Sequence, residues 1–245
     1  MSLLRFHEID ALPLAFDLDA SKTIHRAVYG FSSLARLLLL KPNEFASFLR
    51  KPCEIASETL ASVSANKKVS NLLDTYGRTK FGFARVEDKN NVGGLVGLPE
   101  VLGLYETGAI SSDLAVKQVG SKLVSTEGGT SIRKALKLMF ERRYRRMFIS
   151  GGKEFVSDRA MIGHVFSPAV LSAIAHGTDD VLAAPISEVD KMVAKEVRPD
   201  AKLAEAARAL KAEKAGQCLV YDGAVVTPWD LVMKPYAGKA LNIKA

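Results

Sequence analysis

An internal repeat constrains the fold of this chain more than any other feature of its sequence. Three segments share an apolar spacing of i, i+3, i+4 and i+7, which is typical of an amphipathic helix. A short β-prone stretch, holding Val63, Val124 or Val197, precedes each segment. The apolar positions are Val69, Leu72, Leu73 and Tyr76, then Ile132, Ala135, Leu136 and Met139, and then Leu203, Ala206, Ala207 and Leu210.

Two short strand-like runs follow each predicted helix. In the last two copies these runs flank Gly151-Gly152 and Asp222-Gly223. Such pairs predict tight hairpins, since the central residues need positive φ. A second helix is expected after each hairpin, over 99–107, 168–176 and 228–233. The repeating unit is therefore β-α-β-β-α.

The turn between the second hairpin strand and the second helix can be aligned in four copies, with a period of roughly 60 residues. In the first copy Ile24, Ala27, Val28 and Phe31 repeat the helical spacing, but the hairpin is expected to be incomplete. The four turns are Lys41-Pro42-Asn43-Glu44, Gly97-Leu98-Pro99-Glu100, Ser157-Asp158-Arg159-Ala160 and Thr227-Pro228-Trp229-Asp230.

The last copy resembles the cystathionine-β-synthase (CBS) domain, through 216–223 and the segment 225–231 with its Thr-x-x-Asp. The resemblance is fullest over copies three and four and weakest over residues 1–50. It implies an α/β fold of repeated CBS-like units, arranged as tandem pairs (Bateman modules) of the archaeal stand-alone type. The expected modules are 1–118, with a degenerate first unit, and 119–245. It also implies regulatory binding of adenosine compounds between paired units, without catalysis.

Thr227, Pro228 and Asp230 are the strongest candidates for nucleotide contact. A hydroxyl residue at a strand end, directly before a helix, places its Oγ beside free backbone N–H groups, which suits a phosphate. An aspartate three residues later can accept hydrogen bonds from both ribose hydroxyls, and proline suits the first turn because its missing N–H is not needed there. The alternative is a plain helix cap, with Thr227 as N-cap and Asp230 complementing the helix dipole.

Other candidate residues complete the expected site. The resemblance implies that basic residues entering the first hairpin strand contact phosphates, and arginine offers a bidentate fork for them. The alternative is an exposed basic face that continues Arg133, Lys134 and Lys137.

Copy three is expected to form a weaker second site, because Ala160 replaces the aspartate. Copies one and two carry Glu44 and Glu100 there. The candidates are Arg145 and Arg146 for the phosphates, Val197, Pro199, Gly216, Gln217 and Cys218 for the base, and Ser157, Asp158 and Arg159 for the weaker site.

Charge favours an anionic partner without choosing one. The chain has 34 Lys+Arg against 27 Asp+Glu, a formal net charge of +7, and such a field attracts nucleotides, nucleic acid or acidic membrane surfaces. The adenine nucleotides AMP, ADP and ATP, with or without Mg²⁺, are the expected ligands, and S-adenosylmethionine is not separated from them. The alternative function is nucleic-acid binding through the arginines of 142–146, among which Tyr144 is the one interleaved aromatic residue for base stacking.

Several classes of protein and site are not expected. Residues 127–131 precede a helix but lack the Gly-Lys-Ser/Thr ending of a phosphate-binding loop. The 2 cysteines and 4 histidines show no spacing that favours a metal site or a catalytic triad, so no enzyme and no covalent cofactor are expected.

The longest apolar run, 37–40, is far too short to cross a membrane, and the amino terminus shows no secretion pattern, so a cytoplasmic protein is expected. CBS modules pair through their helices, which implies a homodimer or an intramolecular disc. The regulated protein is not indicated.

Overall fold

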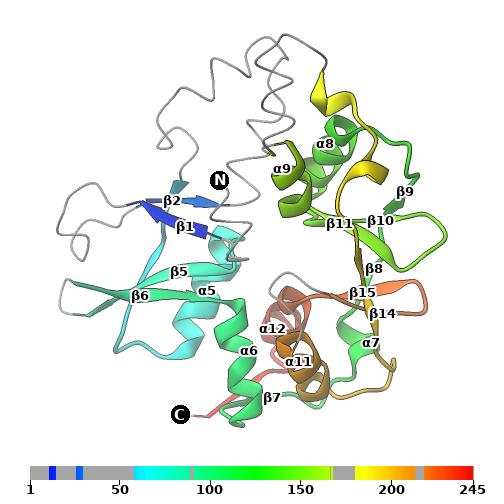
Figure 1. Cartoon of the computed structure of the whole chain (residues 1–245). Helices are drawn as coiled ribbons and strands as arrows, with labels where there is room; N and C mark the ends of the chain where they lie inside the picture. Colours follow the sequence, from blue (N-terminus) through cyan, green and yellow to red (C-terminus); the bar gives the residue numbers. More distant parts are fainter. Residues whose placement is uncertain are drawn as a thin grey trace. The chain divides into compact units, whose positions relative to one another are not determined.

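The computed structural model of the chain describes residues 11–14, 26–29, 58–88, 91–165, 167, 180–212 and 218–244 (Figure 1). The chain divides into two compact units. Unit 1 comprises 1–14, 26–58 and 124–193, and unit 2 comprises 15–25, 59–123 and 194–245. Both units draw on both halves of the sequence, and the expected modules 1–118 and 119–245 stay a prediction.

Copy two lies in unit 2 and has the predicted β-α-β-β-α order. Its first strand is parallel to the second, which forms an antiparallel hairpin with the third. The elements are β4 (Ser62–Ser64), α5 (Val69–Thr79), β5 (Phe83–Asp88), β6 (Asn91–Gly97) and α6 (Leu98–Glu106).

Copy four, also in unit 2, repeats this topology. Asp222 and Gly223, the two residues of its hairpin turn, have φ of 40° and 72°, which confirms the tight turn predicted from Asp-Gly. The elements are β13 (Lys195–Glu196), α11 (Leu203–Ala212), β14 (Leu219–Tyr221), β15 (Ala224–Val226) and α12 (Pro228–Ala237).

Copy three forms the corresponding unit within unit 1. Its second helix follows the hairpin directly, because the Ser157 hydroxyl caps it by accepting a hydrogen bond from the N–H of Ala160 at 3.0 Å. The expectation that this helix begins at 168 is therefore wrong, and 168–176 itself lies outside the described residues. The elements are β9 (Ser125–Thr126), α8 (Ile132–Arg142), β10 (Arg146–Ile149), β11 (Glu154–Ser157) and α9 (Asp158–Val165).

Two added strands were not predicted. β8 (Ser121–Lys122), which leads into copy three, pairs with β15 of copy four. β12 (Met192–Val193), which leads into copy four, pairs with β11 of copy three. Each of these two sheets thus gains a fourth strand from the segment that begins the other copy.

The prediction of a helix in copy one is wrong for residues 26–29. These residues form β2 (Arg26–Tyr29), which pairs antiparallel with β1 (Ala11–Leu14). Val28 and Tyr29 have high β propensity, and pairing with β1 satisfies their backbone groups. Four apolar residues at helical spacing are too short a pattern to separate a helix from a strand. Lys41 and Glu44 lie outside the described residues. The remaining short elements are β3 (Glu58–Thr59), β7 (Ile110–Ser111), α7 (Val116–Val119), β16 (Asn242–Ile243), η2 (Val181–Ala183) and η3 (Ile186–Glu188).

The predicted apolar stripes form the cores. In unit 1, α8 buries its stripe against Met147 and Val156 of the hairpin. In unit 2, α6 packs against α11 and α12 (Figure 1), and the stripes of α5 and α11 share one core with them. Helices of copies two and four therefore associate within a single chain. No helix in the part of the chain described here combines the length and apolarity needed to cross a bilayer.

A buried hydrogen bond joins copies two and four at a proline. Pro235 lies inside α12 and has no N–H, so the carbonyl four residues earlier, that of Leu231, loses its helical donor. The hydroxyl of Tyr105, on α6, donates to this carbonyl at 2.8 Å. Burial raises the pKa of Tyr105 well above its usual value, so the phenol stays a neutral donor.

Removing this donor should destabilise unit 2. We expect Tyr105→Phe to lower the free energy of unfolding by about 1–3 kcal/mol, because a buried carbonyl is left unsatisfied. In a Pro235→Ala background, residue 235 has an N–H that can bond Leu231, so the loss should shrink to about 0.5 kcal/mol or less. Urea denaturation of the double-mutant cycle measures this coupling, and equal losses in the two backgrounds would contradict it.

Candidate functional site

The turn at Thr227 begins α12 with reciprocal hydrogen bonds. The N–H of Thr227 donates to Asp230 Oδ2 at 2.9 Å, and its hydroxyl donates to the same oxygen at 2.7 Å. The N–H of Asp230 lies 3.4 Å from Thr227 Oγ1, and Pro228 occupies the first helical position. The capping alternative considered from the sequence is thus present in this structure, and it fixes the carboxylate at the helix N-terminus.

The second carboxylate oxygen has partners far away in the sequence. Ser121 donates its hydroxyl to Asp230 Oδ1 at 2.8 Å, and the ammonium of Lys234 lies 3.0 Å from the same oxygen. Asp230 as a whole is only 4% exposed. We call Ser121, Thr227, Asp230 and Lys234 the Asp230 cluster. A buried carboxylate requires such donors, because desolvation disfavours its charge.

Lys234 also closes the end of another helix. Its Nζ donates to the carbonyls of Val119 at 2.6 Å and Gly120 at 3.1 Å, and to Ser121 Oγ at 2.8 Å. These carbonyls end α7, where a cation is favoured. The Lys234 side chain remains 40% exposed, so Lys234 is the most exposed residue of the cluster.

An aromatic ring borders the cluster. A side chain at Gly120 would place its Cβ 2.8 Å from Cζ of Tyr221, so any larger residue would force this ring to shift. The pKa of Tyr221 is raised by burial and by the negative charges of Asp230 and Asp222. Ser121, Lys234 and Tyr221 are neighbours of the candidate site that sequence reasoning missed.

The residues expected to contact the base do not all lie at the same end of the sheet as Thr227. In the register of the sheet, Leu219 lies opposite Val226, so the buried Cys218 lies at the end of β14 that adjoins Thr227. Val197 follows β13, which runs parallel to β14, and its N–H bonds the carbonyl of Val220 at 3.0 Å. Val197 and Pro199 thus lie toward the opposite end of β14. Gly216 and Gln217 are outside the described residues.

The candidates in copy three pair with one another. Asp158 is 1% exposed, and its Oδ2 lies 3.0 Å from Nε of Arg145. Arg146 lies opposite Ser157 in the hairpin register, and Arg159 follows in the first turn of α9. Arg145 is therefore already bound to a buried carboxylate. Contact of either arginine with a phosphate stays a prediction.

Copy two has the same turn without a hydroxyl. The N–H of Gly97 donates to Glu100 Oε2 at 2.7 Å, which matches the bond between Thr227 and Asp230. A Cβ at position 97 would lie 2.9 Å from the Phe83 ring, so a threonine there would require this ring to shift. This turn caps α6 but lacks the hydroxyl expected of a phosphate contact.

Within the described ranges, no three His, Cys, Asp or Glu side chains are grouped so that they could hold a metal ion.

The structure is a repeat protein built from β-α-β-β-α units, each with a capped turn before its second helix. Comparison with known proteins finds solved structures of the same fold. No protein-family model matches the chain, and no curated protein does. A protein from Methanocaldococcus jannaschii, described as a proposed archaeal homologue of γ-AMPK, is 13% identical with a TM-score of 0.77, over 96% of this chain and 91% of that one. An uncharacterised conserved protein from Pyrococcus horikoshii is 13% identical with a TM-score of 0.55, over 92% and 96%.

A CBS domain-containing protein of unknown function from Kribbella flavida is 14% identical, over 49% of this chain and 95% of that one, with a TM-score of 0.38. The chain has the fold of the two structural neighbours that cover nearly all of it, which confirms the repeated α/β fold expected from the sequence.

The ammonium of Lys234 should contribute measurably to stability. We expect Lys234→Met to lower the free energy of unfolding by about 1–3 kcal/mol, because it leaves the Asp230 carboxylate and two helix-end carbonyls without a charged donor. Lys202→Met is the matched control: Lys202 is exposed and should change stability by less than about 0.5 kcal/mol. Chemical denaturation measures both, and indistinguishable values would contradict this role.

Proposed function

We propose that this protein is a regulatory module that binds an adenine nucleotide, AMP, ADP or ATP, at the Asp230 cluster. The observation that carries the proposal is the buried carboxylate of Asp230. Thr227 holds its Oδ2 at 2.7 Å, while a hydroxyl and an ammonium occupy Oδ1. A ribose offers two adjacent hydroxyls, which are donors of the kind this carboxylate already accepts.

Binding would exchange one set of donors for another. The Lys234 ammonium also bonds the carbonyls of Val119 and Gly120 and Ser121 Oγ, so it can leave the carboxylate while it keeps other acceptors. A ribose hydroxyl would take its place on Oδ1, and the released ammonium would become available to a phosphate. Thr227 would keep its capping bond to Oδ2.

The surroundings suit the rest of a nucleotide. Backbone N–H groups at the start of α12 favour a phosphate. The Tyr221 ring beside Gly120 offers a flat apolar surface. Contacts of Arg145 or Arg146 with outer phosphates belong to the same proposal and are tested separately below.

The regulatory role rests on the fold. CBS-like repeats imply ligand sensing without catalysis, and one structural neighbour is described as a homologue of γ-AMPK. We propose accordingly that the chain is not an enzyme, that it acts in the cytoplasm, that it forms a homodimer and that it regulates another protein.

The decisive variant is Asp230→Ala. Loss of a charge-assisted hydrogen bond costs about 1.5–3 kcal/mol, so affinity for every adenosine ligand should fall roughly 10- to 150-fold. Calorimetry with AMP, ADP, ATP and adenosine measures this, after a thermal-shift screen identifies the ligands that raise the melting midpoint.

Glu100→Ala is the matched control, since Glu100 makes the same capping bond in copy two. It should lose similar stability and keep full nucleotide affinity. Unchanged affinity in Asp230→Ala, or equal losses in the two variants, would remove the Asp230 cluster from consideration.

Lys234→Met tests whether a ribose hydroxyl displaces the ammonium from Asp230, because the two possibilities change adenosine affinity in opposite directions. If a ribose hydroxyl displaces the ammonium, removing this competitor should strengthen adenosine binding about two- to fivefold. Weaker adenosine binding would show instead that Lys234 contacts the ligand directly.

Arg146→Ala tests the phosphate contact. It should penalise ATP about tenfold more than adenosine, and equal effects would exclude that contact. A DNA titration at varied salt accompanies both experiments, because nucleic-acid binding through 142–146 would weaken steeply as salt rises.

A further inference from the structure

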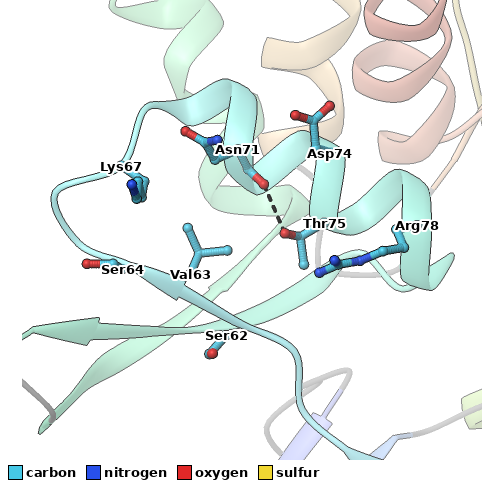
Figure 2. Close-up of a pocket in the computed structure, with 8 residues that line it drawn as sticks. All are labelled: Ser62, Val63, Ser64, Lys67, Asn71, Asp74, Thr75 and Arg78. Atoms are coloured by element: carbon cyan, nitrogen blue, oxygen red, sulfur yellow. Dashed lines mark hydrogen bonds between the residues drawn. The ribbon is translucent and has the colours of Figure 1, made fainter.

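Unit 2 contains a second polar site, in copy two and outside the Asp230 cluster. An open pocket of about 350 Å³ lies between β4 and the outward face of α5 (Figure 2). Val63 supplies the one apolar side chain of its lining, and the other lining residues are polar or charged. The pocket therefore offers hydrogen bonds and charge rather than a surface for an apolar ligand.

Cations mark the two ends of the pocket. Figure 2 shows Lys67 at one end and Arg78 at the other, with the Arg78 side chain reaching back along α5 toward Thr75. Among the residues that the structure describes, no carboxylate lies within ion-pair distance of either side chain. Two such cations in one pocket favour a ligand with an anionic group at each end.

The start of α5 adds to this positive field. Its N-cap is Lys68, whose side chain makes no capping bond, and its first turn has no acidic residue. Natural helices usually carry hydroxyl or acidic side chains at this end, where the dipole favours negative charge. An anion beside Lys67 would compensate both the Lys67 ammonium and the positive end of the α5 dipole.

The middle of the pocket presents acceptors. The Thr75 hydroxyl donates to the carbonyl of Asn71 at 2.9 Å, and the Ser64 hydroxyl donates to Asn66 Oδ1 at 2.9 Å. Both oxygens keep lone pairs that can accept a hydrogen bond. A ligand that meets them with hydroxyl groups would satisfy the centre of the pocket.

Asp74 is held at the rim. Its Oδ1 accepts a hydrogen bond from the hydroxyl of Tyr236 at 2.6 Å, and in Figure 2 its side chain points away from β4. Burial and the bond to Asp74 raise the pKa of Tyr236 to about 12, so the phenol remains a donor at neutral pH. This contact keeps the carboxylate from facing an anion in the pocket.

We propose that this pocket binds a small hydroxylated molecule with an anionic group at each end, the chemistry of a sugar bisphosphate. Lys67 and the start of α5 hold one phosphate, Arg78 holds the other, and Ser64 and Thr75 accept hydrogen bonds from hydroxyl groups between them. The site uses no residue of the Asp230 cluster, so the chain would respond to two ligands of different chemistry.

Fructose 1,6-bisphosphate is the probe, titrated into the full chain at 150 mM KCl and followed by calorimetry and by NMR shifts of the amides of 62–78. Binding should be tighter than that of inorganic phosphate, and neutral fructose should bind far more weakly than either. Arg78→Gln and Lys67→Gln should each weaken the bisphosphate about tenfold, because each removes a charge-assisted hydrogen bond.

Arg208→Gln is the matched control, since Arg208 is also an exposed helical arginine of unit 2 and should leave binding unchanged. Equal losses in Arg78→Gln and Arg208→Gln would show that the basic surface attracts anions generally, and would overturn the proposal. No binding of the bisphosphate, or amide shifts confined to other residues, would also overturn it. Asp230→Ala should leave this affinity intact, so failure here is distinguishable from failure of adenine-nucleotide binding.

Discussion

The helix pairing in unit 2 depends on how α12 tolerates its internal proline. A proline in a helix removes one donor, and in a buried helix the orphaned carbonyl must find another. Here that donor is the Tyr105 hydroxyl, 2.8 Å from the Leu231 carbonyl. The bond joins copy two to copy four across 126 residues of sequence. It fixes α12 against α6, and α12 carries both Asp230 and Lys234.

The three described copies use one turn in three chemically different ways. In copy four a threonine and an aspartate share the cap, and the aspartate keeps an oxygen for further partners. In copy two a glutamate caps a glycine that lies against the Phe83 ring. In copy three the serine caps alone, and a buried aspartate is paired with Arg145. The common fold therefore supports unequal sites, which the differing residues at the turn had indicated.

Local patterns in the sequence predicted most of the fold. The stripes of α5, α8 and α11 are buried as their spacing required, and the turn at Asp222-Gly223 forms the expected hairpin. What the sequence could not supply are contacts between distant segments. Ser121 lies 109 residues from Asp230, and Tyr105 is even further from Leu231. Lys234 was within reach, because it follows Asp230 by one helical turn, but the helix was expected to end at 233. Contact of Val197 with a base stays a prediction, and its place is set by the register of a parallel strand pair, which spacing along the chain does not reveal.

The added strand β8 has a consequence for dividing this protein. Sheets with uncovered edges recruit strands from other molecules, and β8 covers the outer edge of β15. A fragment that begins at residue 124 would retain every helix and strand of copies three and four except this cover. Its hairpin at β14 and β15 would then present an open backbone ladder directly beside Thr227. Such a fragment would be prone to self-association through that ladder, so β8 belongs to copy four as much as its own helices do.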